Sequence, residues 1–188
     1  MSYVQRRRFL WILLLAALTL LAVVANATTL ARMRLEELAR QATAIARLRC
    51  LGSKSLWEYG EIWTDTDFEV VQQAKGSLSA TVTVRTLGGT LGHLHSRIEE
   101  APIFHQGEEA YLFLWGHQGE PLRVLGWSQG TFRIARDGRT GVETVSQDSA
   151  TIPVFDRQTR RFIHSGIRNL PIAAFQLELR KALDGSMP

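Results

Sequence analysis

The sequence predicts a mainly β domain, built as a small barrel or sandwich with one helix near each end. Three observations support this fold class. Apolar and polar side chains alternate in several short runs, as they do in strands with one solvent-exposed face. Glycine-containing turns separate these runs at short intervals. Helical spacing of apolar residues follows only residue 34 and residue 171 in the part after the first 30 residues. No internal repeat or low-complexity linker divides this part, so we expect one domain.

The first segment of the chain is predicted to be an export signal. Three arginines at 6–8 precede an unbroken apolar stretch, 9–25, and the residues at 25–27 fit the small-residue rule for signal-peptidase cleavage. As a helix the stretch would cover about 25 Å, against about 30 Å of hydrocarbon in a bilayer. We therefore expect 1–27 to be a cleaved signal peptide, or an uncleaved anchor that crosses the membrane through residues 9–25. The domain at 28–188 would be periplasmic, extracellular or anchored to the inner membrane facing outward.

Composition limits the partners of this domain. Three of the 22 basic residues of the chain lie in the export signal, so residues 28–188 carry 19 basic and 18 acidic side chains. This near-neutral balance makes nucleic acid an unlikely partner. Cys50 is the only cysteine, which excludes an internal disulfide, and its apolar neighbours predict a buried, inert thiol.

The spacing of apolar residues predicts the first elements of the domain. Leu35, Leu38 and Ala42 recur at helical spacing and predict a short amphipathic helix that packs on the domain. The period then changes to two, which predicts strands at 46–50, 62–71 and 80–86. Turns are expected at 58–60 and 75–77, and the glycines at 88, 89 and 92 predict a flexible or tightly turned segment.

The later elements include a strand expected at the centre of the sheet. Residues 110–115 are apolar throughout, which indicates a strand buried on both faces. Five shorter strands are expected after it, at 122–127, 131–135, 142–145, 152–155 and 161–163. Asp137-Gly138 predicts a hairpin turn. A closing helix would follow Pro171, with an apolar face formed by Ile172, Phe175, Leu179 and Leu183 and with Gly185 at its end.

Several short motifs resemble a family of exported bacterial β-rich proteins without an assigned activity. They are Gly88-Gly89, Ala101-Pro102-Ile103-Phe104, Gly107-Glu108-Glu109, Leu112-Phe113-Leu114 and Gly126-Trp127-Ser128-Gln129-Gly130-Thr131-Phe132. More distantly, the order of elements is similar to netrin-like domains, which are OB-type barrels that include inhibitors of metalloproteases. The pieces that match are 44–48, 68–76 and 107–112. The resemblance implies an OB-like (netrin-like) barrel, and an envelope protein such as a secreted protease as a partner. The cysteine through which those inhibitors meet zinc is missing here.

Two histidines are the weak candidates for a metal site. His93 and His95 are two residues apart, so on a strand both side chains would point to the same face. A third ligand would then complete a zinc site. This spacing alone is a weak signal, and a solvent-exposed strand face or loop is the favoured explanation. We therefore expect no metal and no cofactor, and keep a metal-assisted hydrolase using these histidines as the alternative function.

Aromatic and amide side chains in turns are the candidates for binding. Trp57 and Tyr59 lie at a predicted turn, where their rings would stay exposed as a binding platform, although most aromatic residues of such a domain are core. Gln129 lies in the turn before Thr131, where its amide either fixes the turn or lines a groove. With no nucleophile motif in the chain, we expect an exported envelope domain that binds a ligand or partner without catalysis. Oligonucleotide or saccharide binding on the barrel face is a further alternative.

Overall fold

The computed structural model describes residues 30–116 and 119–185. The predicted signal peptide or anchor at 1–27 lies outside the described residues. None of the helices within the described ranges is long and apolar enough to cross a membrane. From Ala31 onward the chain forms one compact unit.

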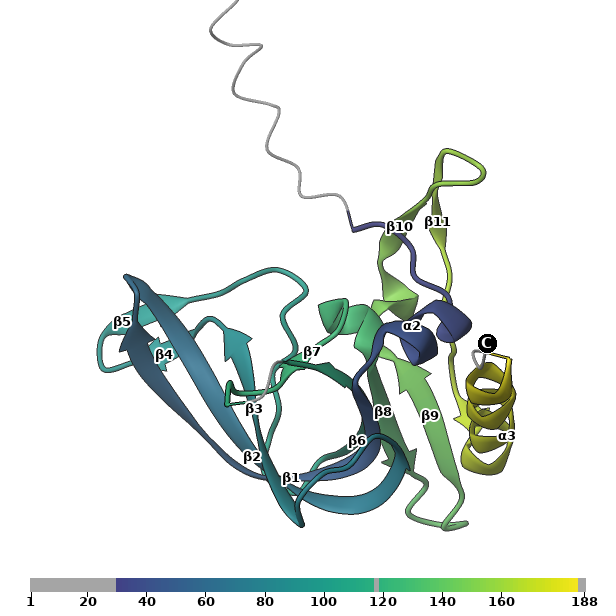
Figure 1. Cartoon of the computed structure of the whole chain (residues 1–188), viewed down its shortest axis with the longest axis horizontal. Helices are drawn as coiled ribbons and strands as arrows, with labels where there is room; N and C mark the ends of the chain where they lie inside the picture. The colour runs from purple at the N-terminus through teal and green to yellow at the C-terminus, as the bar shows by residue number, and fades with distance from the viewer. Residues whose placement is uncertain (1–29, 117–118, 186–188) are drawn as a thin grey trace, which may run out of the picture. The chain divides into compact units, whose positions relative to one another are not determined.

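The fold is mainly β and its strands pair antiparallel, which confirms the predicted class (Figure 1). The main sheet has the strand order β12-β9-β8-β6-β1-β2-β3, and β7 pairs with β6. Its strands are β1 (Ala44–Glu58), β2 (Glu61–Lys75), β3 (Thr81–Leu87), β6 (Glu109–Trp115), β7 (Arg123–Val124), β8 (Thr131–Arg136), β9 (Glu143–Gln147) and β12 (Leu170–Pro171). Two small hairpins accompany it, β4 (Gly89–Leu91) with β5 (Leu94–Ser96) and β10 (Pro153–Asp156) with β11 (Arg161–His164). The described strands do not close into a complete barrel.

One half of the sheet nevertheless curls back toward itself. Val84 on β3 forms an isolated parallel bridge with Leu122, directly before β7. The amide of Arg85 donates to the Leu122 carbonyl at 2.7 Å. Because β7 pairs with β6 and β6 pairs with β1, the strands β1, β2, β3, β7 and β6 follow one another around a ring with a single bridge between β3 and β7.

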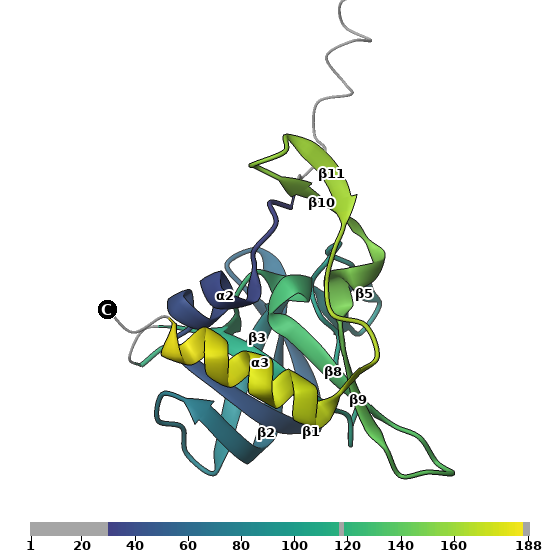
Figure 2. The ribbon, with the colours of Figure 1, turned by 90° about the vertical axis from the view of Figure 1, so that its right-hand side faces the viewer.

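Two hydrophobic cores lie on opposite faces of β1 and β6. Ala44, Ala46, Leu48 and Cys50 of β1, with Leu112 and Leu114 of β6, face the ring interior beside Phe68 and Phe104. Ile45, Tyr111 and Phe113 face the other core, which α2 (Leu35–Gln41) and α3 (Ile172–Asp184) cover (Figure 2). This explains why β6 is apolar throughout: both of its faces are buried, as predicted.

The closing helix follows the predicted apolar face. Phe175 is fully buried, and its ring lies 5.0 Å from Tyr111 and 5.2 Å from Phe132 between centroids. Leu179 and Ala182 complete the buried stripe, and Gly185 caps the end as expected. Pro171 directly precedes the first helical residue.

Three local predictions are wrong. The strand expected at 122–127 stops at Val124, because Gly126 takes a left-handed conformation (φ 64°) and a short 3-10 turn, η1 (Trp127–Gly130), follows. His93 falls in the turn before β5, so it does not share a strand with His95. The segment after Gly88 is a small hairpin, β4–β5, where only a turned segment was expected.

The start of the compact unit is fastened to the β10–β11 hairpin. Ala31 forms a parallel bridge with Phe155, and the Arg32 amide donates to the Phe155 carbonyl at 2.9 Å. A second turn of 3-10 helix, η2 (Asp148–Thr151), leads from β9 into this hairpin. The hairpin and the turn that joins β8 to β9 lie at opposite ends of the unit (Figures 1 and 2).

Candidate ligand-binding site

At one end of the ring, hydroxyl side chains replace the apolar ones that face its interior. Cys50 pairs with Phe68 inside the ring, but beyond the bulge at residue 51 the next inward pairs are Ser53 with Thr66 and Ser55 with Thr64. The hydroxyl oxygens of these pairs lie 2.8 and 3.0 Å apart. Thr64 Oγ1 also donates to the Gly88 carbonyl at 2.7 Å and Ser55 Oγ accepts from the Thr90 amide at 3.3 Å, so the Ser55–Thr64 pair can offer a further partner only an acceptor.

These hydroxyl groups line a cavity of about 260 Å³, which we call the hydroxyl cavity. Its other walls are the β4–β5 hairpin and the loop 97–104. Gly89 permits the close approach of the hairpin: a Cβ there would overlap Thr64 Oγ1 and lie 2.5 Å from Ser55 Oγ. Gly89 therefore reflects packing of backbone against hydroxyls, and Gly88 packs instead against the Ser96 carbonyl, 2.8 Å from where its Cβ would lie.

A second hollow of about 260 Å³ is lined by three tryptophans, and we call it the tryptophan groove. Trp63 comes from β2, Trp115 from the end of β6 and Trp127 from the start of η1. Trp115 and Trp127 are 37% and 38% exposed, so their rings are available at the surface. The groove and the hydroxyl cavity share four lining residues, Thr86, Leu87, Ala101 and Pro102. The two hollows therefore lie on either side of one short wall.

Arg123 on β7 is the charged group of the groove. Its guanidinium carbon lies 5.0 Å from the ring centroid of Trp63 and 6.0 Å from that of Trp115. Cation–π contacts of this kind hold a cation over an indole face. In the described part of the chain Arg123 has no carboxylate partner, whereas Arg85 is paired with Asp65. Arg123 is thus a held cation whose donors are available to an anion.

The backbone around Trp127 is specialised. Trp127 has φ 54°, a left-handed conformation that costs a non-glycine residue about 1–3 kcal/mol. Three contacts hold it there: the Gln129 amide donates to Gly126 O at 2.9 Å, Thr131 Oγ1 donates to Trp127 O at 3.1 Å, and the Ser128 amide donates to Glu100 O at 3.1 Å. Such strain persists where the surrounding structure over-determines it, and it clusters at functional sites.

Two buried side-chain atoms in the described ranges lack a hydrogen-bond partner, Trp63 Nε1 and Ser128 Oγ. One belongs to the groove itself and the other to the residue beside Trp127. Native structures satisfy nearly all buried polar atoms, so an exception marks strain, function or a missing partner. Their common location favours the groove as the functional region.

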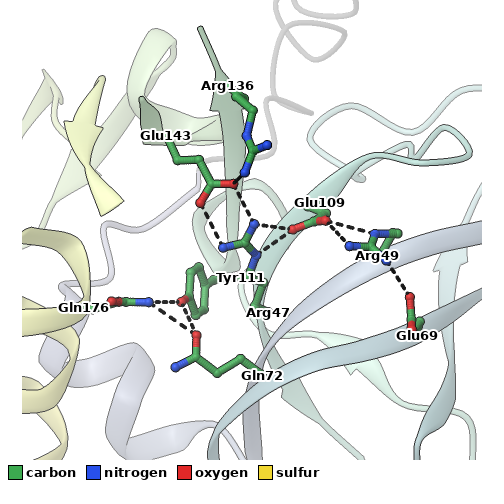
Figure 3. A network of polar contacts seen from close by, with 9 residues as sticks. All are labelled: Arg47, Arg49, Glu69, Gln72, Glu109, Tyr111, Arg136, Glu143 and Gln176. Atoms are coloured by element: carbon green, nitrogen blue, oxygen red, sulfur yellow. Dashed lines mark hydrogen bonds and ion pairs between the residues drawn. The ribbon is translucent and has the colours of Figure 1, made fainter. Parts of the chain in front are cut away.

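The most extensive polar network lies elsewhere and satisfies itself (Figure 3). Arg47 binds Glu109 and Glu143, and Arg49 joins Glu109 to Glu69. Arg136 also contacts Glu143, so three arginines balance three glutamates across β2, β1, β6, β8 and β9. Hydrogen bonding to Arg47 lowers the pKa of Glu143. Burial alone would raise the pKa of Glu109, but its hydrogen bonds from Arg49 and Arg47 outweigh burial and hold that pKa below its usual value. The network ties strands together and leaves no charge for a ligand.

The predicted aromatic platform is exposed. Trp57 and Tyr59 lie at the β1–β2 turn and are 56% and 91% exposed. Gln129 is instead buried, at 2% exposure, and lines a separate cavity of about 440 Å³. Its Oε1 accepts from the Met33 amide at 2.7 Å, and its Nε2 donates to the Ala31 carbonyl at 2.8 Å. Gln129 therefore lies apart from the β1–β2 turn and fixes the N-terminal segment.

The histidines lie near the hydroxyl cavity without forming a metal centre in the described structure. Nδ1 of His95 lies 2.9 Å from Thr90 Oγ1, and His95 lines the cavity. No three His, Cys, Asp or Glu side chains of the described ranges lie together as a metal-binding group. Cys50 is 1% exposed, and burial raises the pKa of its thiol.

Sequence reasoning missed Arg123 as a site residue. Its only signal was a basic residue inside an otherwise apolar run, Leu122–Trp127. No protein-family model, no curated protein and no solved structure matches the chain.

Proposed function

We propose that the protein is an exported envelope domain that binds a ligand, without catalysis, in the tryptophan groove and the adjoining hydroxyl cavity. The observation that carries this proposal is the guanidinium of Arg123, held over two indole rings and left without a carboxylate among the described residues. Concave sites with aromatic walls and a few converging polar groups are the usual form of small-ligand sites.

We also propose that the five ring strands form a partly open barrel of OB type. The single Val84–Leu122 bridge as the weak point of the ring supports this, because OB domains are five-stranded and partly open. OB domains bind ligands on the face of their second and third strands and at the loops that join strands one to two and four to five. Counted in chain order, Trp63 and Leu87 lie on the second and third of these five strands, and Trp115 and Arg123 flank the connection from the fourth to the fifth.

The ligand class that we propose is an acidic oligosaccharide. Indole faces stack against the C–H face of a pyranose ring, and Trp115 and Trp127 offer two of them. Arg123 and Trp63 Nε1 are donors only, so the polar atom that they prefer is an acceptor such as a carboxylate oxygen. The hydroxyl cavity next to the groove would hydrogen-bond the hydroxyl groups of a neighbouring sugar unit. The domain is close to neutral, which weighs against a long polyanion such as nucleic acid.

Calorimetric titration of the full chain, kept in detergent, tests this proposal with two matched ligands. Uronic-acid oligosaccharides should bind saturably, and neutral oligosaccharides of equal length should bind more weakly. Arg123→Gln should reduce affinity for the acidic ligand about tenfold or more, because a charge-assisted hydrogen bond contributes about 1.5–3 kcal/mol. Trp115→Ala should weaken both ligands.

Trp57→Ala is the matched control, since Trp57 is an exposed tryptophan outside the groove. It should leave affinity unchanged. Loss of binding in Trp57→Ala with normal binding in Arg123→Gln would move the site to the β1–β2 turn. Absence of saturable binding by either oligosaccharide would reject the ligand class.

A further inference from the structure

The tip of the β10–β11 hairpin carries exposed basic and aromatic side chains. Arg157, Arg160 and Arg161 are all exposed, and the described residues offer none of them a carboxylate. Phe162 is 60% exposed, and its ring meets that of Phe155 in a T-shaped arrangement with 5.4 Å between centroids. The hairpin therefore presents three free cations around one apolar ring.

The single acid of the hairpin does not offset this charge. Asp156 is buried, and its Oδ1 accepts from the amides of Gln158 and Thr159 at 2.8 and 3.2 Å. Its Oδ2 accepts from Arg32 at 3.1 Å. Both carboxylate oxygens are thus occupied, one by the turn and the other by the N-terminal segment. The outward surface of the hairpin therefore stays positive.

The hairpin is also the place where the chain enters the compact unit. Ala31 and Arg32 pair with the backbone of Phe155. Five residues, 26–30, separate Ala31 from the apolar stretch at 9–25. Fully extended, five residues and their joining bond span about 20 Å at most. If the apolar stretch remains in a membrane, Ala31 and the hairpin beside it cannot leave the neighbourhood of the headgroups.

We propose that residues 9–25 are retained as an anchor and that the β10–β11 hairpin rests on the anionic phospholipid headgroups of the same membrane. Arginines near an anionic lipid surface are attracted to it, and aromatic rings favour the interface between headgroups and hydrocarbon. The contact would fix the orientation of the domain relative to the membrane surface. It is independent of the oligosaccharide proposal, because Arg123 and the three tryptophans take no part in it.

The test uses the full chain in lipid nanodiscs. A fluorophore is attached through Gln158→Cys at the hairpin tip, where the native side chain makes no hydrogen bond in the described structure and Cys50 is buried. Nitroxide-labelled headgroups act as quenchers, in discs of phosphatidylcholine with or without phosphatidylglycerol. Arg139→Cys, on the turn between β8 and β9 at the opposite end of the unit, is the matched labelling position.

Quenching at position 158 should exceed that at position 139 by about twofold or more, and only in discs that contain phosphatidylglycerol. The triple change Arg157→Gln, Arg160→Gln, Arg161→Gln should remove the difference, while the control triple change Arg40→Gln, Arg97→Gln, Arg180→Gln should keep it. Phe162→Ser should lower quenching without abolishing its lipid dependence. Equal quenching at the two positions, or no effect of the hairpin triple change, would overturn the proposal. So would a mass spectrum of the membrane-purified chain that begins at residue 28.

Discussion

At the scale of single residues, the groove depends on a backbone that few side chains tolerate. Trp127 adopts a left-handed conformation that is energetically unfavourable for a non-glycine residue, and Gly126 and Gly130 flank it in the sequence. Gly130 itself is not left-handed. It is required because a Cβ there would overlap the carbonyl oxygen of Leu125 and approach Val124 Cγ1 to 3.2 Å. The short motif around Trp127 thus fixes the position of one indole ring.

Gly130→Ala should therefore lower the free energy of unfolding by about 2–3 kcal/mol, since the clash is with backbone that cannot rotate away. Gly138→Ala is the control, because an added Cβ would meet nothing within 4 Å there. Its effect should stay within about 0.5 kcal/mol. Urea unfolding of the two variants and the parent measures both values, and equal stability of the two variants would contradict the packing argument.

Part of the candidate site follows from single residues and part does not. The exposure of Trp57 and Tyr59 was predictable, because a tight turn leaves no room to bury two large rings. The role of Arg123 was not, because its lack of a carboxylate is a property of what surrounds it in space. The amide of Gln129 was expected either to fix a turn or to line a groove; it lines a cavity, and its partners, Met33 and Ala31, lie almost a hundred residues away.

At the scale of elements, the sequence pattern underestimates the length of the first two strands. β1 and β2 each run for 15 residues, far beyond the predicted 46–50 and 62–71. The alternation is broken on β1 by the register shift between Cys50 and Gly52, and hydroxyl groups then take the inward positions. A pattern search for apolar residues stops where the cavity begins. The functional end of β1 is therefore the part that periodicity misses, whereas the predicted strand at 62–71 already included Thr64 and Thr66 of β2.

At two of its backbone groups the N-terminal segment is held by one side chain, that of Gln129. Gln129→Leu would leave the Met33 amide and the Ala31 carbonyl without their partner, at a cost of about 2–4 kcal/mol. Hydrogen exchange of the Met33 amide should then become much faster than in the parent protein. Gln73→Leu is matched, since Gln73 also bonds two backbone groups, of Gly76 and Leu78, but at an exposed turn. It should cost less than about 1 kcal/mol, because water replaces those bonds. Unchanged exchange at Met33 in Gln129→Leu would show that other contacts hold the segment.

At the scale of the whole molecule, two cores share one wall. β1 and β6 present alternate residues to the ring interior and to the face covered by α2 and α3. The uninterrupted apolar run at 110–115 predicted the β6 half of this wall, whereas the β1 half was expected to have one solvent-exposed face; both terminal helices were predicted. It did not predict how the sheet divides around the wall, since the path from β6 to β8 and β9 and the bridge from β3 to Leu122 are long-range pairings with no local signal.

The network of Arg47, Glu109 and Glu143 gives stability a pH dependence of known sign. Both glutamates have a folded-state pKa below the usual value, so they bind protons less readily in the folded than in the unfolded state. Their contribution is complete above about pH 4.3, the pKa of an unfolded glutamate. It is lost as pH falls below that value, through their folded-state pKa. Burial raises the pKa of Asp148, which acts in the opposite sense.

Urea unfolding between pH 7 and pH 3 measures this dependence. Glu143→Gln should be less stable than the parent at pH 7 and should lose less stability than the parent below about pH 4.3. Glu178→Gln, at an exposed position of α3 without an ion pair in the described structure, should follow the parent curve. Parallel curves for Glu143→Gln and the parent would mean that the network does not govern acid sensitivity.

The contact between α2 and α3 has a consequence for how the protein is made. Leu38 and Ala39 from the beginning of the compact unit meet Phe175, Leu179 and Ala182 from its end in one core (Figure 2). A nascent chain that still lacks residues 172–184 cannot close this core, so completion of the fold waits until those residues have been synthesised. Until then the polypeptide stays incompletely folded. This is the state in which a translocation channel for unfolded chains can accept it.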